Sequence, residues 1–171
     1  MEILDAQLMI PVEADPTTLL KEYENCSMAV GMRALKEGKG DAFVSAGSTG
    51  ALVVGASLIV KRLKGVRRTG IATVIPNEKG CFLLMDSGAN AECNSDMLVQ
   101  FGMMGSVYMN KILGVDSPKV GLINIGTEET KGLDLQVETY HKLQNAPVNF
   151  VGNVEARSLP MGECDVAVCD G

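Results

Sequence analysis

Tryptophan is absent from this chain, and aromatic residues make up only 4% of its 171 residues. A core built on large rings is therefore not expected. Ten methionines and nineteen glycines instead predict aliphatic packing and tight turns. Because 46% of the residues are apolar, a disordered chain is excluded, and the length suffices for a real core.

Histidine is also scarce, because His141 is the only one, and it falls inside the predicted helix 133–144. A Ser-His-Asp or Cys-His arrangement is therefore disfavoured. No His/Cys cluster has zinc spacing, so we expect no metal and no cofactor. An enzyme of this composition would position its substrates and stabilise charge rather than use a covalent nucleophile.

Positive charge is limited, with a formal net charge of −6, which argues against nucleic acid as a partner. The densest basic stretch, Lys61–Arg68, closes a predicted helix, where cations suit the negative end of the helix dipole.

Long apolar runs and paired cysteine motifs are missing as well. The longest apolar stretch, Ala51–Val60, is well short of the roughly 18 residues that span a bilayer. No signal-peptide pattern is recognised at Met1. The five cysteines form no C-x-x-C pair and predict reduced, mostly buried thiols in a cytoplasmic protein.

The elements that are present alternate between strand and helix patterns. Helices are predicted at 16–23, 27–36, 51–64, 95–113 and 133–144, and strands at 42–45, 71–75, 81–86, 119–124, 148–151 and 166–169. Within 95–113 the side chains expected to face inward are Leu98, Phe101, Met104, Val107 and Tyr108. Strands 71–75 and 81–86 are expected to form a hairpin. We predict one α/β domain over residues 1–171, with a mixed, mainly parallel sheet and helices on both faces.

Five polar, glycine-rich loops stand at the ends of apolar runs. They are Ser45–Gly50, Asp86–Asn90, Asn124–Gly132, Gly152–Arg157 and Asp170–Gly171. Ligands of open α/β sheets bind beyond the carboxyl ends of the strands. Several such loops carrying Ser, Thr, Asn, Lys and Arg predict a polar ligand that bears phosphate.

In the first loop, Ser45, Gly47, Ser48, Thr49 and Gly50 precede a predicted helix. Free backbone N–H groups and the positive helix end there would make an anion site. The loop matches neither the Walker A pattern nor G-x-G-x-x-G, so nucleotide binding gains no support from a motif. The alternative is that the glycines only allow a tight turn, and the local pattern leaves both interpretations open.

Asp86 and Asn90 flank the second loop. Asp86 could orient a ligand hydroxyl or hold a cation, or it could cap the loop. A single aspartate favours the cap.

Lys131 lies in the longest loop. It could neutralise a phosphate, or it could pair locally with Glu128 or Glu129. Arg157 could bind an anion through two N–H groups, or it could be a surface residue.

Five segments along the chain resemble phosphate acyltransferases, the PlsX family of bacterial phospholipid synthesis. They are Asp41–Leu52, Leu84–Asn90, Met104–Tyr108, Val120–Glu128 and Asn149–Arg157. The resemblance runs from about Asp15 to Gly171. It implies a three-layer αβα sandwich similar to the isocitrate dehydrogenase-like fold. It also implies transfer of a fatty acyl group from acyl carrier protein to inorganic phosphate, which gives acyl phosphate, and a homodimer.

The resemblance also assigns roles to residues. Lys131 aligns with a family lysine proposed to act in catalysis, and we place Asp170 beside it as a second catalytic residue. Substrate or phosphate contacts are expected from the other polar loop residues, namely Ser45, Gly47, Ser48, Thr49, Gly50, Asp86, Asn90, Asn124, Asn153 and Arg157.

The chain departs from the family in places. Ser48 stands where the family usually has Asn, and Glu22–Cys26 replaces basic residues. The family's Met-Gly-Gly-Asp motif is missing, and the family continues beyond Gly171. We therefore expect a fragment of a longer phosphate acyltransferase, poorly active or inactive alone, with uncovered apolar surface. Peripheral membrane contact is expected only from the missing C-terminal part.

Two other functions stay open at this point. One is a non-catalytic remnant that keeps the fold. The other is a nucleotide or phosphate-metabolite enzyme, dehydrogenase-like or kinase-like, on a similar sheet.

Overall fold

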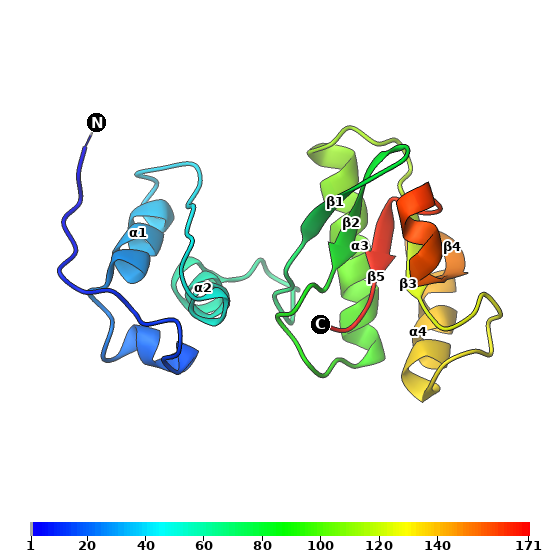
Figure 1. The fold of residues 1–171 in the computed structure, drawn as a ribbon, viewed down its shortest axis with the longest axis horizontal. Coiled ribbons are helices and arrows are strands. Elements are labelled where there is room, and N and C mark those ends of the chain that lie inside the picture. The colour runs from blue at the N-terminus through cyan, green and yellow to red at the C-terminus, as the bar shows by residue number, and fades with distance from the viewer. Residues whose placement is uncertain (1) are drawn as a thin grey trace. The chain divides into compact units, whose positions relative to one another are not determined.

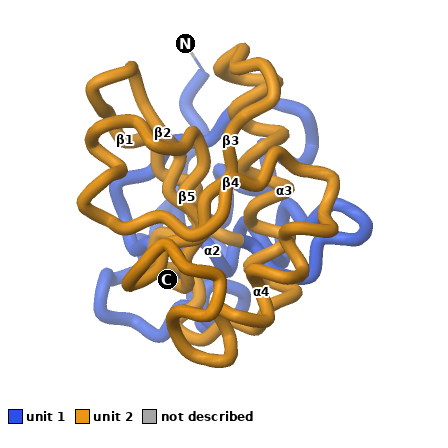
Figure 2. Tube along the Cα trace, turned by 90° about the vertical axis from the view of Figure 1, so that its right-hand side faces the viewer, with its two compact units in different colours: residues 1–69 blue, residues 70–171 orange. Residues whose placement is uncertain are grey.

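The structure is a computed structural model that describes residues 2–171. The chain divides into two compact units, the first ending at Thr69 and the second running from Gly70 to Gly171 (Figure 2). The single domain expected over residues 1–171 stays a prediction.

The first unit is helical. Its elements are the 3-10 helix η1 (Pro16–Leu20), the α-helices α1 (Ser27–Lys36) and α2 (Thr49–Gly55), and the π-helix η2 (Ala56–Lys61). Asp15 caps η1, because its carboxylate accepts a hydrogen bond from the Thr17 amide at 2.8 Å. The core of this unit consists of Ile10, Leu19, Cys26, Met28, Ala29, Met32, Ala51 and Ile59.

The strand predicted at 42–45 is wrong. The structure assigns no strand there, so the first glycine-rich loop does not follow a strand end. Phe43 packs against the helical core while Val44 is 92% exposed. Two apolar residues suggested a buried strand, but a strand needs a hydrogen-bonded neighbour, and none pairs with this segment among residues 2–171. The helix predicted at 51–64 also differs, since α2 passes into η2 and ends at Lys61.

The second unit carries the sheet (Figure 1). Its strands are β1 (Thr73–Asn77), β2 (Gly80–Met85), β3 (Lys119–Ile123), β4 (Asn149–Val154) and β5 (Val166–Val168). They lie in the order β1-β2-β5-β3-β4, and only the β1–β2 hairpin is antiparallel. The predicted hairpin and the mixed, mainly parallel sheet of an α/β fold are therefore confirmed.

Helices α3 (Ser95–Lys111) and α4 (Asp134–Gln144) pack on one face of this sheet (Figure 1). Side chains alternate across the strands, so Leu83 faces α3 while Phe82 faces the other side, where the 3-10 helix η3 (Ala156–Met161) contributes Leu159. Gly105 lets α3 approach the sheet closely, since a methyl group there would lie 2.5 Å from Cγ1 of Val166.

The inward face of α3 is narrower than predicted. Leu98 and Phe101 are buried, and Met104 packs against the core, but Val107 is 60% exposed and Tyr108 is also exposed. The core-facing row continues instead through Gly105 and Met109, at helical spacing from Phe101. Although α3 has 17 residues, no helix among residues 2–171 has the length and apolar character needed to cross a membrane.

Candidate functional site

Four of the five predicted loops meet at one edge of the sheet. Strands β2, β5, β3 and β4 run parallel, so the residues that follow them emerge together. Leu122 pairs with Val168, and therefore Asn124 and Asp170, each two residues further on, leave neighbouring strands at the same level. The loop Ser45–Gly50 belongs to the first unit and is described by itself.

Asp86 is a buried structural carboxylate at the start of the Asp86 loop (Asp86–Asn90). It is 1% exposed. Its oxygens accept from the amides of Ile71 at 2.7 Å, Ala89 at 3.1 Å and Asn90 at 2.7 Å, and from Nδ2 of Asn90 at 2.9 Å. The loop-capping interpretation fits this geometry, because backbone donors occupy both oxygens. No group of three or more His, Cys, Asp or Glu side chains that could hold a metal ion occurs among residues 2–171.

Asp170 lies beside the Asp86 loop but presents its side chain to solvent. The chain is fixed on both sides of it, since the Asp86 amide donates to the Cys169 carbonyl and the Gly171 amide donates to the Asn90 carbonyl, both at 3.0 Å. Asp170 itself is exposed. An exposed carboxylate on fixed backbone can accept a hydrogen bond from a ligand hydroxyl.

Two thiols of the second unit, Cys164 and Cys169, are poor nucleophiles. All five cysteines are free; Cys26 and Cys164 are buried, and the other three are half-buried. Burial, reinforced by neighbouring carboxylates, raises the pKa of Cys164 to about 12 and that of Cys169 to about 11. Only the thiolate attacks an electrophile, so neither residue is activated for catalysis near neutral pH.

Asn124 braces the Lys131 loop (Asn124–Gly132) at both ends. Its Oδ1 accepts from the Ile125 amide at 2.8 Å, and its Nδ2 donates to the Lys131 carbonyl at 2.9 Å. Gly132 allows this closure, because its φ is +90° and a methyl group there would lie 2.7 Å from Oδ1 of Asn124. The side chain predicted to bind substrate thus shapes the loop.

Asn153 holds the middle of the same loop from β4. Its Nδ2 donates to the Glu128 carbonyl at 2.7 Å. Its Oδ1 is buried and has no hydrogen-bond partner among the described residues. Because the remaining atom is an acceptor, it suits an N–H or O–H group better than a phosphate oxygen. The predicted contact between Asn153 and phosphate stays a prediction.

The Lys131 amine is the chemically available group of this loop. Lys131 is exposed, and no ion pair or hydrogen bond of its amine is found within residues 2–171. Its stem lies over Gly126, where a methyl group would be 3.2 Å from its Cγ and 2.9 Å from Oε2 of Glu128. The alternative of a local pair with Glu128 or Glu129 is therefore not realised, although Glu128 lies close by.

Arg157 is engaged locally. Its Nη2 donates to Oε2 of Glu155 at 2.7 Å, and its side chain is 80% exposed. This favours the surface interpretation, but a guanidinium has five N–H donors, so one pair leaves capacity for an anion. Its predicted role in binding stays untested.

In the first unit, the serines of the Ser45–Gly50 loop organise the turn. The Ser45 hydroxyl accepts from the Gly47 amide at 3.1 Å, and the buried Ser48 hydroxyl accepts from the Ala51 amide at 3.3 Å and caps α2. Thr49 and Gly50 begin that helix. The anion expected at Gly47–Gly50 remains a prediction.

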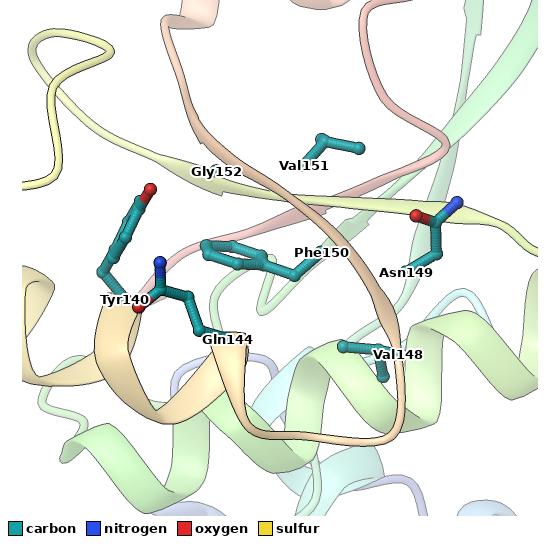
Figure 3. A pocket seen from close by; sticks show the side chains of 7 residues that line it. All are labelled: Tyr140, Gln144, Val148, Asn149, Phe150, Val151 and Gly152. Atoms are coloured by element: carbon teal, nitrogen blue, oxygen red, sulfur yellow. The ribbon is translucent and has the colours of Figure 1, made fainter.

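Hollows in the second unit were not anticipated from the sequence, and two of them include residues of the predicted loops. The apolar hollow, of about 560 Å³, is lined by Ile123, Asn124, Ile125, Gly132, Leu133, Gln136 and Ala156. The sequence feature that could have indicated this hollow is a pair of apolar residues, Ile125 within the polar loop and Leu133 just after it. The other, of about 480 Å³, is polar; its lining includes Gly152 of the fourth loop but none of the predicted site residues. Figure 3 shows Tyr140 and Gln144 of α4 facing Phe150 of β4.

Comparison with known proteins identifies relatives along the whole chain. The family model described as "Fatty acid synthesis protein" matches residues 1–171. A "Phosphate acyltransferase" from Caldicellulosiruptor bescii is 49% identical over 172 residues, covering 100% of this chain and 52% of that protein. One from Clostridium botulinum (Loch Maree) is 45% identical and is covered to 51%. The chain thus spans about half the length of these curated relatives.

Solved structures agree on the fold. A phosphotransacetylase from Streptococcus pyogenes matches with a TM-score of 0.66 at 19% identity, covering 86% of this chain and 51% of that one. The EutD phosphotransacetylase from Staphylococcus aureus matches with a TM-score of 0.59 at 20% identity, covering 98% and 63%. The predicted fold class and resemblance are confirmed, and the chain belongs to the fatty acid synthesis protein family, whose members compared above are named phosphate acyltransferase.

Proposed function

We propose that this chain carries part of the active site of a phosphate acyltransferase, which moves a fatty acyl group from acyl carrier protein to inorganic phosphate. A phosphate oxygen attacks the thioester carbonyl carbon, the C–O bond forms, the C–S bond breaks, and the departing thiolate takes up a proton. The product is an acyl phosphate for phospholipid synthesis. Phosphate is itself the nucleophile, so this reaction requires no activated Ser or Cys.

The observation that carries the proposal is the Lys131 amine, which has no ion-pair partner among residues 2–171 and is carried on a loop braced by two asparagines. In this reaction negative charge develops on the thioester carbonyl oxygen in the transition state, and the phosphate is already negatively charged. A cation held at a fixed place beside either charge stabilises the transition state, and losing one such donor typically costs about 10²–10³ in rate. The side chains of Asn124 and Asn153 fix the backbone from which Lys131 reaches.

Asp170 complements this lysine in the proposal. Asp170 is exposed and follows β5, the strand next to β3, at the same level as Asn124. It can accept the hydroxyl hydrogen of a protonated phosphate and so orient the attacking oxygen. We propose a further phosphate contact from the remaining N–H groups of Arg157. For the first unit, taken by itself, we propose that the amides of Gly47–Gly50 bind an anion.

The test is formation of acyl phosphate, trapped as the hydroxamate with hydroxylamine, together with phosphate-dependent consumption of acyl carrier protein thioester. It is run on this chain alone and on this chain joined to the remaining half of a relative. Product from either form supports the proposal. If neither form gives product, the proposal fails and a non-catalytic remnant gains support. Binding of NAD or ATP would instead point to a nucleotide enzyme.

The proposal includes a homodimer located in the cytoplasm. Gel filtration with light scattering measures the first point directly. A monomer at micromolar concentration in the joined protein would contradict it.

A further inference from the structure

The apolar hollow adjoins the Lys131 loop within the second unit. Gly132 lines it and directly follows Lys131 in the chain. The Lys131 stem lies over Gly126, the residue after Ile125, which also lines the hollow. A cationic head and an apolar wall therefore share one loop. A ligand that bridges them needs an anionic head and an apolar tail.

The polar side chains in the lining of the hollow are engaged by the loop itself. Both polar atoms of Asn124 are bonded, to the Ile125 amide and the Lys131 carbonyl. Oε1 of Gln136 accepts from the Leu133 amide at 3.1 Å. None of the seven lining residues is charged. The wall thus makes few hydrogen-bonding demands on an occupant, which suits an alkyl chain and disfavours a sugar or a base.

Two large apolar side chains at this place lie in water. Ile125 is 80% and Leu133 is 76% exposed. Both border the hollow, whose volume of about 560 Å³ is in the usual range for small-molecule sites. An occupant that covers them gains from removal of apolar surface from water.

We propose that the apolar hollow holds the alkyl chain of the acyl group while Lys131 meets its anionic or oxyanionic head. This inference rests on the proposed function and assigns the place of the tail. The anionic head and the alkyl tail then contribute independently to the binding free energy. Substitutions at Lys131 and substitutions in the hollow therefore change separate contributions. Lys131 sets the affinity common to all chain lengths, and Ile125 and Leu133 set the gain for each methylene.

The test measures binding of n-alkyl phosphonates, stable mimics of acyl phosphate, from butyl to octyl below their micelle concentrations, by calorimetry on the 171-residue chain. Burial of a methylene in the hollow is expected to tighten binding about two- to fourfold, so octyl should bind at least about tenfold tighter than butyl. Ile125→Ser should reduce that difference to less than about threefold, because it weakens octyl phosphonate more than butyl phosphonate. Ala156→Leu, which fills the hollow, should weaken octyl phosphonate selectively.

The matched control is Ile112→Ser, at a 65% exposed isoleucine at the end of α3 and outside the lining, which should leave the chain-length series unchanged. Lys131→Ala should weaken all chain lengths equally. A series that Ile125→Ser does not alter, or no binding of any phosphonate, overturns the inference. If the chain-length effect of Ile125→Ser holds but Lys131→Ala weakens none of them, the tail site stands and the proposed function fails.

Discussion

The Asp86 loop and the Lys131 loop leave the same edge of one sheet, yet they use their charged residue in opposite ways. Asp86 is buried and accepts from three backbone amides. Lys131 is exposed, and its amine has no partner within residues 2–171, while its backbone is braced by Asn124. Position at the carboxyl edge therefore does not decide whether a charged side chain is available to a ligand. The distinction lies in whether neighbouring groups already satisfy its charge.

The largest expected effect is on stability, from Asp86→Ala. Removing the carboxylate leaves the amides of Ile71, Ala89 and Asn90 without their acceptor in a buried place. We expect a loss of about 3 kcal/mol or more of unfolding free energy, measured by urea denaturation. Asp170→Ala, at the exposed neighbour, should cost less than about 0.5 kcal/mol. Equal stability of the two variants would contradict the assignment of a structural role to Asp86 and not to Asp170.

A smaller effect on stability is expected at Asn124, which holds the loop backbone and is also proposed to position Lys131. Asn124→Asp keeps the acceptor for the Ile125 amide but loses the donor to the Lys131 carbonyl. Stability should fall by about 1 kcal/mol, and turnover of a competent form should fall further than that loss explains. Unfolding curves and rates measured together decide this. A stability loss with unchanged turnover would show that the brace does not position Lys131.

The Cys169 thiol lies against the Asp86 loop, since it donates to the Asp86 carbonyl at 3.2 Å. Burial and nearby carboxylates raise its pKa from the ordinary 9.0 to about 11. The folded state thus holds the proton more tightly than the unfolded state, so its contribution is present below pH 9 and lost as pH rises to 11. Cys169→Ala should flatten the fall in stability across that window. Lys131→Ala should not, and an unaltered pH profile in Cys169→Ala would contradict this assignment.

The smallest expected effect is at Arg157, whose exposed pair with Glu155 contributes little stability. Arg157→Gln should change the unfolding free energy by less than about 0.5 kcal/mol. The KM for phosphate of this variant then shows whether the Arg157 side chain binds substrate, as proposed for Lys131. A severalfold rise would group it with Lys131, and an unchanged KM would leave it a surface residue.

The sequence was most informative where local pattern and sheet agree. The alternation of β-rich runs with helices predicted the parallel strands, and the two neighbouring β-rich runs 71–75 and 81–86 predicted the hairpin of β1 and β2. Phe43 and Val44 were misassigned to a strand, because two apolar residues do not show whether a neighbouring strand is available. Val107 and Tyr108 were misplaced because α3 carries apolar residues on more than its inward face.

The candidate site was predictable by residue but not by role. The glycine-rich loop pattern singled out Asp86, Asn124, Asn153 and Lys131. The sequence does not show, however, which of their side-chain atoms form hydrogen bonds with the backbone. Asn124 and Asn153 proved to be braces, since their amides donate to carbonyls seven and twenty-five residues away in the chain. Exposure of Ile125 and Leu133 depends on where the loop lies over the sheet, which spacing alone does not encode.

The most direct test of the account compares Lys131→Ala with Lys119→Ala in a turnover-competent form that carries this chain. Lys119 is an exposed lysine of the same unit at the opposite end of β3. The account predicts that Lys131→Ala loses at least about tenfold in acyl phosphate formation with a nearly unchanged melting temperature, because its charge stabilises developing oxyanion or phosphate charge. Lys119→Ala should retain the parent rate. Parent-like turnover in Lys131→Ala would contradict the account and reduce Lys131 to a surface cation.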